Sequence, residues 1–215
     1  MNIQLKQAKL KRVIIFLAGI STASIPAMVH ADWSIIGLGS LGGSFGEAWS
    51  LNDFGQVVGT SSIANDETHA FMTGPNGVGM SDLHGLVEGG RSSSLATDIN
   101  DSGQAVGRVG GHAFITDSNG IGMTKLGTLG GSETLAYSVN NSGQVVGSST
   151  TANGDIYPFI TGPNGVGMTE LSSLGMGIAW GINDSGQVVG ETGGGHAFIT
   201  GPNGVNMTLL ALAGR

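Results

Sequence analysis

Three histidines recur at equivalent places in this chain and could, by residue type, bind a metal ion. His69, His112 and His196 each stand directly before Ala-Phe. Three imidazoles suffice for a zinc site. Tyr157 takes the place of the histidine in one further copy of the pattern, so a shared set of ligands would be broken there. We therefore expect each histidine to pack beside its own strand and to bond a loop carbonyl, with no metal bound.

Carboxylate and amide side chains are the other candidates for chemistry. Asp66 with Glu67, or Glu88 with Asp98, could form the acid pair of a carbohydrate-cleaving enzyme. Neither pair marks a unique site, and solvated loop charge explains both. Repeated Asn-Asp and Asn-Asn steps resemble calcium loops in composition, but they lack the D-x-[DN]-x-[DN]-G spacing and its distal glutamate. We expect turns at these steps, with calcium as the alternative and no other cofactor.

Many of these residues lie in or beside one phrase, A-x-x-[IVL]-N-[DN]-x-G-Q-x-V-G, which occurs four times. Successive glutamines of the phrase are 48, 40 and 43 residues apart. A period in the forties indicates one supersecondary unit copied along the chain. The four copies are residues 48–59, 96–107, 136–147 and 179–190.

Each copy predicts short strands joined by tight turns. In the third copy, the Asn-Asn-Ser-Gly step suits a type I turn whose final glycine adopts a left-handed conformation. A Gly-Pro-Asn-Gly step predicts a second tight turn further on, since proline has the φ that such a turn needs. The expected strands of this copy are residues 135–139, 144–149, 157–161 and 166–174.

Four antiparallel strands in about 45 residues are the blade period of a β-propeller. We therefore predict an all-β repeat protein with four propeller-like blades, whose sheets stack on one another because one sheet cannot bury both faces. A parallel solenoid would not need two hairpin turns per repeat, and the missing 3.6-residue periodicity argues against helical repeats. The expected repeats are approximately residues 34–81, 82–124, 125–169 and 170–212.

Three segments of the chain resemble a known bacterial family. They are the Leu-Gly-Thr-Leu-Gly-Gly run at residues 126–131, the turn phrase at 182–190 and the His-Ala-Phe tripeptide at 196–198. Together they are similar to the HAF family of probable extracellular repeats, over roughly residues 33 to 210. The resemblance implies export and β structure, but no established activity. The third copy departs from it, because Tyr157-Pro158 replaces His-Ala.

The first 31 residues predict a secretory signal peptide. A basic start that includes Lys9 and Arg12 precedes an apolar stretch, and Val29-His30-Ala31 suits cleavage. We expect a secreted, extracellular or periplasmic protein with no membrane span after cleavage, and the alternative is an uncleaved N-terminal anchor. Four of the eight basic residues would leave with the peptide, and all 15 acidic residues would stay. The acidic remainder has no basic stripe, which argues against a nucleic-acid partner.

The two ends of the expected domain both match the fourth strand of a blade. These segments are residues 35–43 and 207–212, and they resemble residues 124–131. Two arrangements follow. Four blades could close into a ring within one chain, which we slightly favour, or two chains could join through their terminal outer strands as a homodimer. An exposed edge strand is an association hazard and gives the homodimer a physical motive.

Departures from the repeat are the best candidates for ligand contact. Trp49 and Trp180 follow the repeated alanine, where the third copy has Tyr137, and on an inner strand they could stack on a sugar. Core packing between blades is the alternative. A lengthened link between the first two copies adds His84, Glu88 and Arg91 to the candidates.

We expect a non-catalytic module that binds a carbohydrate or another cell-surface component through loops of variable length. The loops are residues 63–68 and 151–155. One alternative is a carbohydrate-active hydrolase or lyase, and another is a structural component of the envelope or matrix.

Overall fold

The computed structural model describes residues 35–84, 93–171 and 175–209. The chain divides into two compact units, which end and begin at Gly37 and Leu38. All described strands belong to the second unit. The signal-peptide prediction lies outside the described residues. Within those residues, no helix is long and apolar enough to cross a bilayer.

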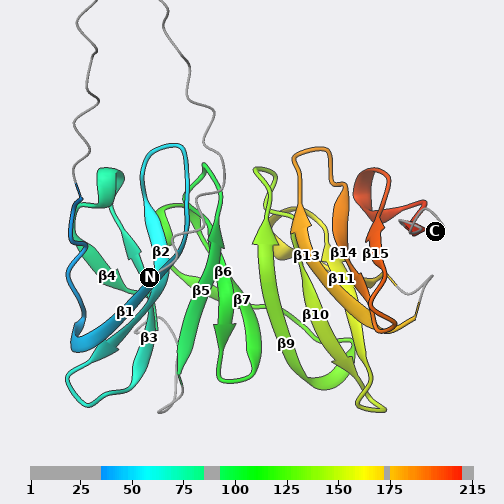
Figure 1. Cartoon of the computed structure of the whole chain (residues 1–215), viewed down its shortest axis with the longest axis horizontal. Helices are drawn as coiled ribbons and strands as arrows, with labels where there is room; N and C mark the ends of the chain where they lie inside the picture. Colours follow the sequence, from blue (N-terminus) through cyan, green and yellow to red (C-terminus); the bar gives the residue numbers. More distant parts are fainter. Residues whose placement is uncertain (1–34, 85–92, 172–174, 210–215) are drawn as a thin grey trace, which may run out of the picture. The chain divides into compact units, whose positions relative to one another are not determined.

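In the described residues, sixteen strands form four antiparallel sheets of four strands each, and in every sheet the strands lie side by side in chain order (Figure 1). The prediction of an all-β protein with four propeller-like blades is confirmed. The first sheet contains β1 (Gly42–Leu51), β2 (Val57–Ile63), β3 (Thr68–Thr73) and β4 (Met80–Asp82). The second contains β5 (Ser94–Ile99), β6 (Ala105–Val109), β7 (His112–Thr116) and β8 (Met123–Lys125). The third contains β9 (Gly130–Val139), β10 (Val145–Thr151), β11 (Ile156–Thr161) and β12 (Met168–Glu170). The fourth contains β13 (Gly177–Ile182), β14 (Val188–Thr192), β15 (Ala197–Ile199) and β16 (Thr208–Leu209).

The turns adopt the expected chemistry. Between β9 and β10, the Asn140 side chain accepts hydrogen bonds from the backbone N–H groups of Ser142 and Gln144. Gly143 then takes a φ of 77°, which glycine adopts without steric penalty. The Pro-Asn-Gly turn is a short 3₁₀ segment, η4 (Pro163–Gly165), whose Gly165 N–H donates to the Gly143 carbonyl. This contact fixes the two turns of a sheet at the same end.

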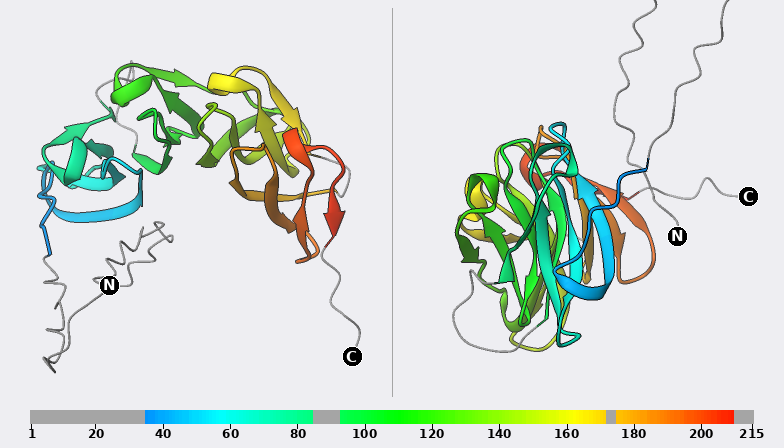
Figure 2. Two further views of the ribbon diagram at one scale, coloured as in Figure 1. Left: turned by 90° about the horizontal axis from the view of Figure 1, so that it is seen from above. Right: turned by 90° about the vertical axis from the view of Figure 1, so that its left-hand side faces the viewer.

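Apolar residues between neighbouring sheets form the core. Three clusters fill the three joints, and each combines strands from two consecutive sheets. The first strands of neighbouring sheets contact one another. The described fourth strands of neighbouring sheets do not come as close to one another. The sheets therefore converge on the side of β1, β5, β9 and β13, as propeller blades do, and Figure 2 shows these strands along the inner side of a curved row.

Close backbone contact in each sheet requires the glycine that ends the repeated phrase. A Cβ at Gly147 would overlap the Leu135 carbonyl oxygen on the paired strand. A Cβ at the glycines equivalent to Gly147 would meet the same kind of carbonyl oxygen. This position of the repeat therefore requires glycine because no room exists for a side chain, and not because of a turn conformation. The equivalent glycines are Gly59, Gly107 and Gly190.

Two expectations about strands were wrong. Residues 35–40 form no strand, and the first sheet starts at Gly42 after a single bridge at Leu41. The fourth strands are also shorter than predicted, since β12 begins at Met168 and ends at Glu170. The single-chain ring does not form in the described residues. Figures 1 and 2 both place the first and fourth sheets at opposite ends of the row, and no pair of strands joins them.

Candidate binding surface on the inner strands

A β-bulge interrupts the first strand of every sheet at the same place. In β1, Ala48 pairs with Gly59 and Ser50 pairs with Val58, so Trp49 is the extra, unpaired residue. A bulge re-aims the side chain of its extra residue and often lies beside a functional site. The equivalent residues are Thr97 in β5, Tyr137 in β9 and Trp180 in β13. We call these four residues the inner row.

The inner row is only partly covered. Trp49 is 57% exposed and Trp180 is 45% exposed, although both are large apolar residues. Trp180 packs against Tyr137 of the preceding sheet, with ring centroids 4.5 Å apart and planes inclined by 56°. Thr97 donates its hydroxyl to the Ala136 carbonyl of the next sheet. The row thus spans all four sheets and combines contacts between sheets with accessible aromatic faces.

Tyr137 is the one described residue of the inner row that can ionise. Burial raises the pKa of its phenol above the ordinary value of 10.0, while a hydrogen bond with Ser148 and the charge of Arg108 act in the opposite direction. The neutral phenol is therefore favoured. It can offer a hydrogen bond at the edge of an aromatic surface, which suits a ligand with apolar faces and polar rims.

Asp98 is a buried carboxylate directly after the bulge of β5. Its two oxygens accept hydrogen bonds from Ser50 of the first sheet at 2.6 Å and from Ser138 of the third sheet at 2.7 Å. The backbone N–H of Val139 also donates to it, at 3.1 Å. One side chain thus links three sheets behind the inner row. Because both carboxylate oxygens already accept these structural hydrogen bonds, Asp98 acts as a positioning residue.

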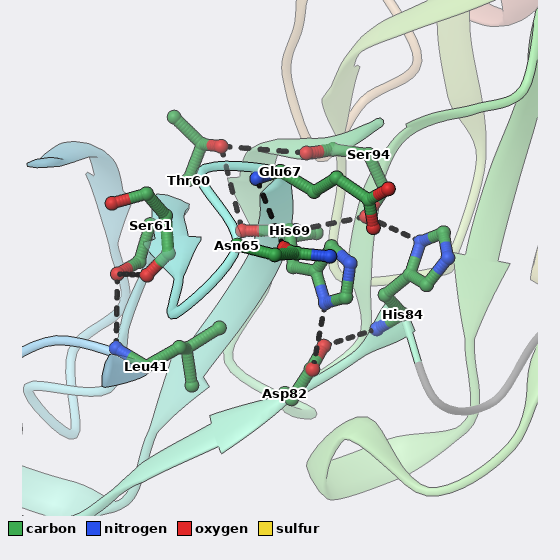
Figure 3. Close-up of polar contacts among 11 residues, drawn as sticks. Leu41, Thr60, Ser61, Asn65, Glu67, His69, Asp82, His84 and Ser94 are labelled. Atoms are coloured by element: carbon green, nitrogen blue, oxygen red, sulfur yellow. Dashed lines mark hydrogen bonds and ion pairs between the residues drawn. The ribbon is translucent and has the colours of Figure 1, made fainter. Parts of the chain in front are cut away.

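A second polar cluster lies at the joint of the first two sheets (Figure 3). His69 Nδ1 is 2.8 Å from Asp82 Oδ2, and the His84 backbone N–H donates to the other oxygen of Asp82. His84 Nδ1 is 3.0 Å from Ser94 Oγ, and the two imidazoles stack with centroids 4.1 Å apart. His69 therefore bonds a carboxylate, and not the loop carbonyl that the sequence predicted.

This cluster lacks the geometry of a catalytic triad. A triad needs one imidazole between the carboxylate and the nucleophile, but here Asp82 contacts His69 whereas Ser94 contacts His84. Ser94 is also only 3% exposed, and its Oγ accepts the Ala70 N–H. The cluster is specific to this joint, since Lys125 and Gly127 take the places of Asp82 and His84 after the second sheet.

The remaining candidates are dispersed. Glu88 and Arg91 lie outside the described residues, so their place beside His84 stays a prediction. His112 and His196 have no carboxylate partner in the described part of the chain. Among those residues, no three His, Asp or Glu side chains are grouped as metal ligands. The Asn-Asp steps make hydrogen bonds between neighbouring sheets, as when the Asp53 N–H donates to Asp101.

The structure thus brings together Trp180 and Tyr137 of the predicted set, in one row with Trp49. Sequence reasoning missed the roles of Asp98, Ser50 and Ser138. One sequence feature could have indicated these roles. All three residues are polar and lie two positions after the repeated alanine, where the fourth copy has Gly181. No protein-family model matches this chain, and the search of curated proteins finds no relative. The resemblance to the HAF repeats therefore stays a prediction.

Proposed function

We propose that this protein is a non-catalytic binding module that holds its ligand against the inner row. The observation that carries the proposal is the exposure of Trp49 and Trp180 at equivalent β-bulges. Core packing, the alternative that the sequence left open, would leave such residues covered. A chain that exposes large aromatic faces at a repeated, bulged position has the features of an interaction surface.

The chemistry of the row favours a carbohydrate. Flat aromatic faces stack on the apolar faces of sugar rings, and polar groups at the rim give orientation. Such rim groups are the phenol of Tyr137 and the hydroxyl of Thr97. The spacing of the row across successive sheets suits an extended chain of sugar units better than a single small molecule. The rigid support behind it, including Asp98, would keep the aromatic groups preorganised.

A glycan and cell-envelope array, run with and without calcium, tests the proposal. Specific binding of a sugar chain is expected, and the Trp180→Ala variant should bind it about tenfold more weakly. One aromatic stacking contact contributes about 1 kcal/mol beyond its buried area, and 1.4 kcal/mol is a factor of ten. Trp49→Ala should behave alike.

Phe54→Ala is the matched control, because Phe54 is an exposed aromatic residue at a turn outside the inner row. It should bind like the unaltered protein. Equal losses in all three variants, or no binding of any glycan in either condition, would refute the proposal. Binding that needs calcium would instead direct attention to the Asn-Asp turns.

A further inference from the structure

Every joint between neighbouring sheets repeats the same directional hydrogen bonds. The asparagine that opens each turn donates its side-chain amide to the next sheet's equivalent carbonyl, as from Asn100 to Asn140 at 2.9 Å. The following residue donates its backbone N–H to the next sheet's side-chain oxygen, as from Asp101 to Asn141 at 2.9 Å. Both bonds recur at all three joints. Each sheet is thus a donor on one face and an acceptor on the other.

The two ends of the row leave this series open. In the described residues, the Asn183 amide donates only to Gln187 of its own turn, and no acceptor meets the Asp184 N–H. At the other end, Asp53 has no donor to its side chain in the described residues. Asn183 is exposed, whereas its equivalents Asn52, Asn100 and Asn140 are buried. The fourth sheet thus presents hydrogen-bond donors, and the first sheet presents the acceptors that such donors bond in the inner joints.

The apolar residues at the two ends match in the same way. Val189 on the fourth sheet is 45% exposed, although its equivalents Val58, Val106 and Val146 are fully buried within the joints. Leu51 on the first sheet is 50% exposed, whereas its equivalent Ile99 is buried against the preceding sheet. The open faces are therefore the two halves of the joint that the chain already builds three times.

The first sheet also carries one residue that imitates a preceding sheet. A Cβ at Gly77 would lie 2.9 Å from Leu38 Cδ2, and a Cβ at Gly165 would lie 2.7 Å from Leu126 Cδ2. Leu126 follows the last strand of the sheet before Gly165. Leu38 thus fills the place that such a leucine takes in the inner joints, so the chain itself covers this part of the first sheet's end face and leaves the rest of that face open.

We propose that a second copy of this chain covers these faces, with the fourth sheet of each copy packed on the first sheet of the other. Head-to-tail contacts form a closed ring when their rotation closes. Two four-sheet rows give eight sheets, at the upper end of the usual range of about four to eight blades. The inference does not rest on the proposed function, because it needs no ligand, although Trp49 lies on the first sheet that the second copy would cover.

Cross-linking tests this arrangement directly, since the chain has no cysteine of its own. In the Asp53→Cys/Asp184→Cys variant, a short bismaleimide should link copies into a product of two chains. Asp53 and Asp184 lie on sheets at opposite ends of the row, whereas the joint between copies would bring them together. Asp101→Cys/Asn141→Cys is the positive control, because these residues are neighbours within one chain.

The Val189→Lys change should reduce the two-chain product at least tenfold, because it places a charge in the apolar joint. Val166→Lys, at a more exposed valine next to a turn and away from the end faces, should leave the yield unchanged. Single chains only, an internal link within one chain, or products longer than two chains would each overturn the two-copy ring. A yield that Val189→Lys does not change would show random collision and would also overturn it.

Discussion

The inner row depends on side chains that no strand pairing holds. Trp49, Thr97, Tyr137 and Trp180 are the extra residues of four bulges, so their directions follow from backbone register and from contacts with the next sheet. Tyr137 is packed beneath Trp180, and this burial explains its raised pKa.

The titration of Tyr137 provides a test at this scale. The chain has two tyrosines, so Tyr157→Phe leaves Tyr137 as the only phenol. Its ultraviolet tyrosinate signal should appear above pH 10.0, because burial disfavours the charged form. The neutral phenol stabilises the folded state fully below the unfolded-state pKa, and this contribution is lost as pH rises through the folded-state pKa. A midpoint at or below 10.0 would contradict the packing described.

The glycine that ends each repeated phrase gives a second test. Gly147→Ala should lower the free energy of unfolding by about 1–3 kcal/mol, the usual cost of overpacking, since its Cβ would overlap the Leu135 carbonyl. Gly127→Ala is the control, because a Cβ there has open space. Urea unfolding measures both. Similar stabilities of the two variants would show that backbone approach at Gly147 is not limiting.

At the scale of elements, Asp98 joins three sheets through donors from β1 and β9. Asp98→Asn replaces charge-assisted hydrogen bonds by neutral ones and turns one acceptor into a donor. We expect a loss of about 1–2 kcal/mol in unfolding free energy, because bonds to charged groups contribute more than neutral ones. Thermal or urea unfolding would show it. Asp155→Asn in an exposed loop should be neutral, and an equally small effect at Asp98 would refute its linking role.

Most of the strands and turns could be predicted from the sequence, because glycine, asparagine and proline act locally. Gly143 and the Pro-Asn-Gly step have few alternatives to a turn. The short fourth strands could not be predicted, since Leu171 is apolar and buried although it follows the end of β12. Its burial belongs to the joint with the next sheet and not to the strand.

Only part of the candidate site could be predicted from the sequence. The aromatic residues at positions 49, 137 and 180 stood out by type, but a bulge is a property of pairing between two strands and leaves no local mark. The role of Asp98 depends on Ser50 and Ser138, which lie 48 and 40 residues away in sequence. Such contacts appear only once the sheets are stacked.

At the scale of the molecule, one joint is repeated three times and then left open at both ends. A repeat array normally protects its terminal faces, because an open face exposes apolar groups and unpaired polar groups. Here Leu51 and Val189 remain half exposed at opposite ends of the row, and the turn donors of the fourth sheet reach no neighbouring sheet in the described residues. Pairing of two copies would bury both faces with contacts that the chain already uses.

The mass of the purified protein in solution, measured by light scattering over a range of concentrations, tests this most directly. A mass of about two chains is expected at micromolar concentration, falling to one chain in Val189→Lys but not in Val166→Lys. The mass of a single chain at every concentration would contradict the repeated-joint assembly.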